Sequence, residues 1–314
     1  MSSLAPPGRS LAHRLTLPVI AAPMTAVSGP DLVIAACRSG LIGSFPTHNA
    51  STTAVLDGWL TRFAAELSSD DAPVAANLVV HRTNDRLAAD LDCLVRHGVE
   101  LVITSVGSPE HVVGPLHGAG ARVFADVANL SQAHRALDAG ADGLILLAAG
   151  GGGQTGWANP FAFVRAVRTR YDGPIVLAGG IADGRSILAA ELLGADLVYL
   201  GTPFIATHES LADDAYRAAL VAASLDDVRL STRVGGIPAS LLASWLESNA
   251  VDGLHAEGFS QDRLLSNRAA WSAGHGVTLV TEVTSVAQLV DALVEQYHEA
   301  RRDLTTLVTP ASHE

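Results

Sequence analysis

Two pairs of small residues end short apolar runs, and both could bind an anion. Gly179 and Gly180 close the run PIVLAGG, and Gly201 and Thr202 follow the run LVYL. Because glycine has no side chain, backbone N–H groups beside it can approach an anion closely. Thr202 adds a hydroxyl donor. The two pairs predict a phosphate site, and tight turns without a ligand are the alternative.

A third glycine-rich stretch, Gly150–Gly153, comes directly before Gln154. Ordering four consecutive glycines costs backbone entropy, which is understandable if a flat ligand lies against the backbone there. The stretch matches neither GxGxxG in a βαβ unit nor a P-loop, which needs a lysine after the glycine. A flexible loop without function is the alternative.

Polar side chains that could hold a ligand or move a proton stand in or just after other apolar runs. Asn77, Ser105 and Asp126 lie in three such runs, and His48 and His81 follow two. Asp126 is the only strong acid in this set. All the basic side chains other than histidine are arginines, which excludes Schiff-base catalysis by lysine. For each histidine, a structural or solvated role is the alternative.

Eight apolar runs, each followed by a helix-like segment, predict the elements that position these residues. The runs are continuous rather than alternating, as in parallel strands buried on both faces. Glycine stands where several of the helical segments end. We therefore predict an α/β fold, a (β/α)8 TIM barrel, whose site forms at the carboxyl ends of the strands. The predicted strands lie at 18–23, 41–45, 73–80, 101–105, 122–127, 143–149, 174–180 and 197–201.

The pattern changes after the eighth run. We expect residues 1–225 to form the barrel and residues 226–314 to form a C-terminal helical extension that completes the barrel and caps the site. Both parts are expected to belong to one structural domain, because barrels of this length are commonly single domains. A separate C-terminal domain is the alternative.

Composition narrows the function classes. The formal net charge of −12 argues against nucleic acid, and no basic run suggests an anionic membrane surface. No apolar stretch is long enough to span a membrane, and the N-terminal residues lack the apolar core of a signal peptide. The two cysteines belong to no metal-ligand pattern. These features predict a cytoplasmic protein with a small-molecule substrate, no metal, and a homodimer as one possible assembly.

Together these stretches resemble the nitronate monooxygenase family, also called 2-nitropropane dioxygenase-like proteins. FMN-dependent enoyl-acyl-carrier-protein reductases and NADH:quinone reductases are related to that family. The C-terminal SAGHGVTLVTEV also has the family's character. The matching stretches, in the family's order, are PVIAAPMTAVSGPDLVIAACRSG, AANLVVHRTN, LVITSVG, GADGLILLAAGGGGQTG, PIVLAGGIADG and GADLVYLGTPFIATHES.

The resemblance implies a TIM barrel that holds FMN without a covalent bond. By motif position, Pro23, Met24 and Thr25 would lie along the isoalloxazine ring. Asn77 and Ser105 would hydrogen-bond the polar edge of the ring or the ribityl chain, and Asp126 would lie near that chain. The phosphate side would be formed by Gly152, Gly153, Gly179, Gly180, Gly201 and Thr202.

One departure from the family pattern affects the chemistry. Family members typically carry histidine in a motif like AGGHxG, where it is the expected base for a nitroalkane. This chain has Gln154 at that position. A glutamine amide can orient a nitro group or nitronate by hydrogen bonds, but it cannot take a proton as an imidazole can. His48 and His81 are therefore the candidates for another base.

The leading hypothesis is an FMN-dependent oxidoreductase that oxidises a small nitronate-like substrate with dioxygen. An NAD(P)H-dependent reductase of enones or quinones is the first alternative. A flavin-binding accessory or biosynthetic protein with altered chemistry is the second, and a phosphate-binding barrel without flavin is the third.

Overall fold

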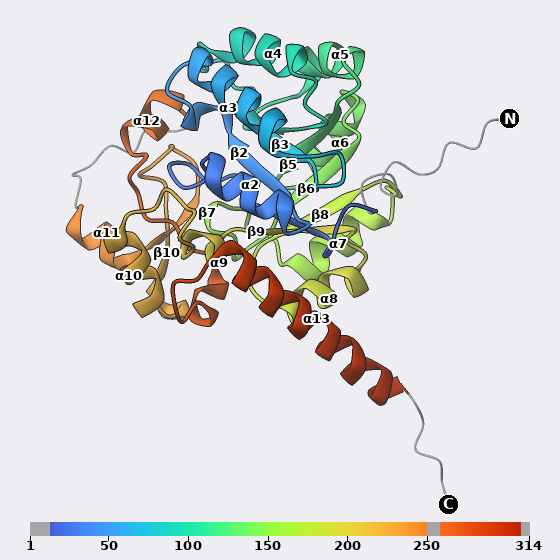
Figure 1. Ribbon diagram of the computed structural model, residues 1–314, viewed down its shortest axis with the longest axis vertical. Helices are drawn as coiled ribbons and strands as arrows, with labels where there is room; N and C mark the ends of the chain where they lie inside the picture. The colour runs from blue at the N-terminus through green and yellow to red at the C-terminus, as the bar shows by residue number, and fades with distance from the viewer. Residues whose placement is uncertain (1–12, 250–257, 309–314) are drawn as a thin grey trace, which may run out of the picture.

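A closed barrel of eight parallel strands forms the centre of the computed structural model, which describes residues 13–249 and 258–308 (Figure 1). The barrel closes because β1 pairs with both β2 and the last strand, β9. The predicted (β/α)8 fold is confirmed, with each predicted run forming its strand. In order around the barrel, the strands are β1 (Val19–Ala21), β2 (Ile42–Pro46), β3 (Val74–Val79), β4 (Leu101–Ser105), β5 (Arg122–Val127), β6 (Gly143–Leu147), β8 (Ile175–Ala178) and β9 (Leu197–Leu200).

Helices follow the strands and surround the barrel (Figure 1). Local sequence sets their ends: Asn159 caps α7 with Pro160 in the first turn, and Asp183 forms a capping box with Ser186 at the start of α8. The helices of the barrel part are α2 (Pro30–Arg38), α3 (Thr53–Glu66), α4 (Leu87–Arg96), α5 (Glu110–Gly118), α6 (Leu130–Asp138), α7 (Pro160–Arg168), α8 (Gly184–Leu193), α9 (Thr202–Ile205) and α10 (Asp214–Ala222).

Apolar side chains fill the inside of the barrel, so that it is a packed core and not a pore. Ile20, Leu101 and Phe124 are fully buried there, and each such side chain contributes about 1.5–3 kcal/mol. Gly143 on β6 leaves space for Phe124, since a Cβ at Gly143 would lie 2.6 Å from that ring. This floor of side chains supports the polar residues at the strand ends.

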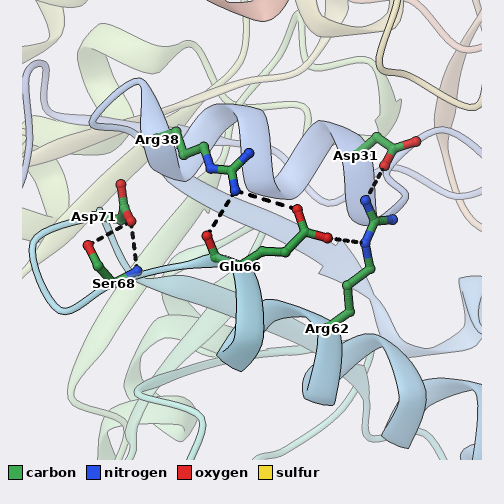
Figure 2. A network of polar contacts seen from close by, with 6 residues as sticks. All are labelled: Asp31, Arg38, Arg62, Glu66, Ser68 and Asp71. Atoms are coloured by element: carbon green, nitrogen blue, oxygen red, sulfur yellow. Dashed lines mark hydrogen bonds and ion pairs between the residues drawn. The ribbon is translucent and has the colours of Figure 1, made fainter.

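Surface ion pairs join α2 to α3 (Figure 2). Arg62 binds Asp31 of α2 at 2.7 Å and Glu66 at 2.6 Å, while Arg38 donates to the Glu66 carbonyl at 2.9 Å. After α3, the Asp71 carboxylate accepts from the Ser68 backbone N–H at 2.7 Å. Exposed pairs of this kind contribute at most about 1 kcal/mol each, so the contact between the two helices depends mainly on their apolar faces.

The region after residue 225 contains strands as well as the expected helices. β10 (Val228–Ser231) and β11 (Ala239–Leu242) form a three-stranded antiparallel sheet with β7 (Gly153–Gln154), which follows β6. The helices α11 (Ala243–Ser248), α12 (Gln261–Ser266) and α13 (Val286–Val308) come next. α13 packs on α8 and extends away from the barrel (Figure 1). Among the described residues, every helix is too short or too polar to cross a bilayer.

Candidate active site

One large cavity opens at the carboxyl ends of the barrel strands. Its volume is about 220 Å³, whereas about 15 Å³ on the same measure holds a water molecule. It therefore has room for a ligand. Every site residue predicted from the sequence except His81 lines it: Pro23, Met24, Thr25, His48, Asn77, Ser105, Asp126, Gly152, Gly153, Gln154, Gly179, Gly180, Gly201 and Thr202.

The floor of the cavity carries polar groups that point in from the strands. Asp126 stands two residues after Phe124 on β5, so it shares the inward face of that strand. Asp126 Oδ1 and the Tyr199 hydroxyl are buried and have no hydrogen-bond partner among the described residues. Nearby, the Ser105 hydroxyl donates to Asn77 Oδ1 at 3.3 Å. Since buried polar atoms are nearly always paired in native proteins, the two unpaired oxygens point to a ligand.

Burial also sets the charge of this floor. Desolvation raises the pKa of Asp126 to about 8, because the carboxylate would lose its hydration. Burial and the nearby Asp126 raise the pKa of the Tyr199 hydroxyl well above its usual value. Both side chains are therefore predominantly neutral at pH 7, and a neutral carboxyl can donate a hydrogen bond.

His48 lies in the cavity wall on a short 3-10 turn, Thr47–Asn49. Its Nε2 is 2.9 Å from the Thr25 hydroxyl, and its Nδ1 is buried without a partner among the described residues. Burial lowers the pKa of His48 to about 4, and the positive charge of Arg86 contributes to the same shift. The imidazole is thus neutral at physiological pH and can accept a hydrogen bond.

His81 is not among the cavity-lining residues. Its Nδ1 lies 2.9 Å from the Thr83 hydroxyl, and its ring meets the edge of Phe259 with centroids 5.3 Å apart. Phe259 does line the cavity. His81 therefore contacts a residue of the cavity wall without lining the cavity itself, which agrees with the structural role given above as the alternative.

The loops after β8 and β9 give the cavity a glycine-lined side. Gly179 has φ +125°, and a Cβ there would lie 2.9 Å from the carbonyl oxygens of Ala148 and Ala149, so only glycine fits. Gly180 has φ +72°, and no heavy atom lies within 4 Å of a Cβ built on it. The Gly180 N–H donates to the Gly150 carbonyl at 3.1 Å, which joins this loop to the four-glycine stretch.

A third loop completes this glycine-lined side. The Thr202 hydroxyl accepts from the Gly274 N–H at 2.9 Å. A Cβ at Gly274 would lie 2.8 Å from the Gly150 carbonyl oxygen and 3.0 Å from the Gly152 nitrogen. At Gly179 and Gly274 the loops therefore meet too closely for side chains, and this side of the cavity presents mainly backbone, as anion sites do. Asp183 already caps α8, so its carboxylate occupies the end of that helix where a phosphate could have bound.

Val106 shows that the backbone beside the floor is strained. It follows Ser105 at the end of β4, lines the cavity and has φ +56°. This left-handed conformation is unfavourable for a β-branched residue, at about 1–3 kcal/mol. Strain of this kind gathers at ligand sites, and the sequence gives no sign of it because valine normally avoids this conformation.

The outer wall comes from the segment after residue 225, in which the sequence indicated no site residues. Gln154 on β7 pairs with Ala239 on β11, so the three-stranded sheet fixes the backbone of Gln154 at the cavity while its side chain stays exposed. The lining residues from this segment are Val234, Gly235, Ile237, Ala239, Leu241, Phe259, Leu264, Asn267, Arg268, Ala270, Ser272, Gly274 and Gly276.

The comparison with protein families establishes to which family the chain belongs. The model of a family described as nitronate monooxygenase matches residues 10–296. The chain belongs to the nitronate monooxygenase family. It is accordingly an oxidoreductase of the flavin-dependent TIM-barrel type, as the motifs predicted.

Relatives with curated names include a dehydrogenase and nitronate monooxygenases. A dehydrogenase of Mycobacterium tuberculosis is 30% identical over 77% of this chain and 68% of its own length. Its name is (3aS,4S,5R,7aS)-5-hydroxy-7a-methyl-1-oxo-octahydro-1H-indene-4-carboxyl-CoA dehydrogenase. A nitronate monooxygenase of Paraburkholderia phytofirmans is 28% identical over 72% of this chain and 74% of its own. The chain thus spans roughly two thirds to three quarters of these relatives.

Solved structures agree on the architecture. Nitroalkane oxidase from Streptomyces ansochromogenes superposes with a TM-score of 0.84 at 25% identity, over 94% of this chain and 99% of that one. FabK from Thermotoga maritima superposes with a TM-score of 0.81 at 22% identity, over 98% of this chain and 100% of that one. The second likeness concerns the fold alone.

Proposed function

We propose that the protein binds FMN in this cavity and oxidises a small nitronate-like substrate with dioxygen. The observation that carries the proposal is the cavity itself: a glycine-lined side where loops meet after β8 and β9, beside a floor with unpaired polar atoms. A phosphate suits the first feature, and the hydrogen-bonding edge of a flavin ring suits the second. The residues present therefore fit FMN.

The cofactor's parts can be assigned to residues of the cavity. Pro23, Met24 and Thr25 would lie along the flavin ring, and Asn77, Ser105 and Asp126 would meet its polar edge or its ribityl chain. When bound, the flavin supplies the redox step, accepting an electron pair and passing it to dioxygen. The residues assigned to the phosphate are Gly152, Gly153, Gly179, Gly180, Gly201 and Thr202.

The chain's own residues favour a substrate that arrives already ionised. Gln154 offers an N–H₂ donor for a nitronate oxygen but has no site that takes a proton. His48 is neutral and half-buried in the cavity wall, so it can hydrogen-bond the substrate, and its low pKa makes it a weak base. His81 is not among the residues that line the cavity. An anionic nitronate needs no deprotonation, so the missing histidine does not prevent its oxidation.

The outer wall has its own part in the proposal. The described residues of the segment 226–314, which are 226–249 and 258–308, would cap the site as part of the same domain as the barrel. The apolar side chains Val234, Ile237 and Leu241 line the cavity from this segment. Covering the flavin ring with such a wall would keep bulk water from the reacting atoms.

A second function is favoured by one observation, the relative named as a dehydrogenase, at 30% identity. It suggests flavin chemistry on a carbonyl compound, such as NAD(P)H-dependent reduction of an enone or quinone, or a biosynthetic step with altered chemistry. Gln154 could then orient a substrate carbonyl.

Two substitutions at Gly180 test the phosphate assignment. A side chain at Gly180 has open space, and aspartate and asparagine tolerate its φ of +72° better than most residues. We expect Gly180→Asp to weaken FMN binding at least about a hundredfold through like-charge repulsion, about 2.7 kcal/mol. Asparagine has nearly the same shape without the charge, so Gly180→Asn should weaken FMN binding much less. Titration of FMN fluorescence gives both dissociation constants. Equal values for the two variants would contradict the assignment of the FMN phosphate to this loop.

A further inference from the structure

Arg268 is the one arginine among the described residues that line the cavity, and the chain contains no lysine. Its side chain is exposed and makes no hydrogen bond or ion pair within the described residues. Several other arginines are engaged: Arg168, for example, binds Asp196 and the Gly194 carbonyl. The guanidinium of Arg268 is therefore a cation at the cavity that has no partner within the described residues and is free to bind a ligand.

The backbone of Arg268 is fixed at the wall although its side chain is free to adjust. α12 ends just before it, where the Asn267 N–H donates to the carbonyl of Arg263 at 3.2 Å. The Ala270 N–H then donates to the Asn267 carbonyl at 2.9 Å, which closes a turn around Arg268. At the other end of α12, the Gln261 N–H donates to the Thr83 hydroxyl at 3.1 Å, which ties the helix to the loop after β3.

Apolar side chains make up most of the outer wall that carries Arg268. Ile237, Leu241 and Leu264 line the cavity together with Phe259. The only acid among the described lining residues is Asp126, which burial keeps neutral at the floor. Because the whole chain carries a net charge of −12, an anion approaches a repulsive surface except where a local cation attracts it.

We propose that Arg268 selects substrates with an apolar body and an anionic group, a carboxylate or a phosphate, at the end remote from the reacting atoms. This rests on the proposed function in that it names the substrate class of the same cavity. The reacting end would lie over the floor beside Gln154 and His48, the apolar body along the outer wall, and the anion at the guanidinium. A planar guanidinium binds carboxylate and phosphate oxygens by two parallel hydrogen bonds.

The test measures binding and not turnover, so its outcome is separate from that of the redox proposal. Isothermal titration calorimetry on the purified protein as isolated compares three eight-carbon probes: octanoate, octyl phosphate and octan-1-ol. We expect at least one anion to bind about tenfold or more tightly than the alcohol, which is about 1.4 kcal/mol. The preference should shrink with added salt. The two anions distinguish carboxylate from phosphate recognition.

Arg268→Gln should remove that preference and leave octan-1-ol binding unchanged. Arg170→Gln is the matched control, because Arg170 is exposed before β8, at the opposite end of the barrel. The proposal is overturned if neither anion binds better than the alcohol. It is also overturned if Arg268→Gln keeps the preference, or if both variants lose it equally. Anion binding in a protein that oxidises no nitronate would leave this inference standing and remove the redox proposal.

Discussion

Replacing Asp126 by asparagine should make the protein more stable, and more so as the pH rises. The carboxyl of Asp126 has a pKa of about 8 in the folded protein against 3.8 for the free side chain, because burial penalises the charged form. Asparagine has nearly the same shape and cannot ionise. The variant therefore avoids the cost of keeping this group protonated in the folded state.

The sign and size follow from proton linkage. Between pH 4 and pH 8, the folded protein binds one proton at Asp126 that the unfolded chain has released. The free energy of unfolding therefore falls by about 1.4 kcal/mol per pH unit in this window and levels off above pH 8. From pH 5 to pH 7, the free energy of unfolding of the wild-type protein should fall by about 3 kcal/mol relative to that of Asp126→Asn.

Urea denaturation of flavin-free protein at pH 5, 6 and 7 measures this difference without a contribution from ligand binding. His48 acts in the opposite direction, since its lowered pKa makes stability rise with pH between about 4 and 6.5. That contribution is common to both proteins and cancels in the comparison. A gap between wild type and variant that stays constant across these pH values would refute the reasoning about a buried, unpaired carboxyl.

Two further predictions concern proton transfer at the site. Gln154→His should raise the rate of oxidation of a neutral nitroalkane by about a hundredfold, which is the range of general base catalysis. The rate with the preformed nitronate should change little. Unchanged rates with both substrates would place Gln154 away from the reacting atoms. His48→Gln should lower kcat/KM for a nitronate about tenfold if His48 hydrogen-bonds the substrate, with His81→Gln as the control that leaves it unchanged. Because the pKa of His48 is about 4, the wild-type pH profile should show no limb near pH 6.5, and such a limb would contradict a buried neutral imidazole.

The barrel is predictable because its signals are local. Each strand is a continuous apolar run, and glycine or a capping side chain marks the ends of the neighbouring helix, as Gly194 and Asp183 do around α8. The positions at the strand ends follow from the fold, since parallel barrel strands all present their carboxyl ends to one face. This is why the amino-acid sequence alone assigns residues as far apart as Thr25 and Thr202 to one cavity.

The outer wall is not predictable in the same way. β10 and β11 are short, and the pairing of β11 with β7 joins residues far apart in the chain, as Ala239 and Gln154 show. No local pattern encodes such a contact, so the sequence predicts a helical segment there and gives Arg268 no role. His81 illustrates a related limit, because the sequence places it after a strand end but does not say whether the loop turns its ring toward the cavity.

Tyr199 both packs in the barrel interior and contributes to the cavity. It lies within β9, and its ring belongs to the apolar core inside the barrel. Its hydroxyl, however, reaches the cavity and has no partner among the described residues. Alternation along a strand indicates that a side chain points inward but not whether its tip lies above the apolar layer.

An absorbance spectrum of the purified protein, followed by anaerobic additions of NADH, NADPH and then a nitronate, tests the central claim most directly. We predict the spectrum of bound FMN, bleached by the nitronate and not by either nicotinamide. Absence of flavin absorbance even after reconstitution with FMN would contradict the cofactor assignment. Bleaching by NADH or NADPH but not by the nitronate would contradict the monooxygenase proposal and favour the reductase.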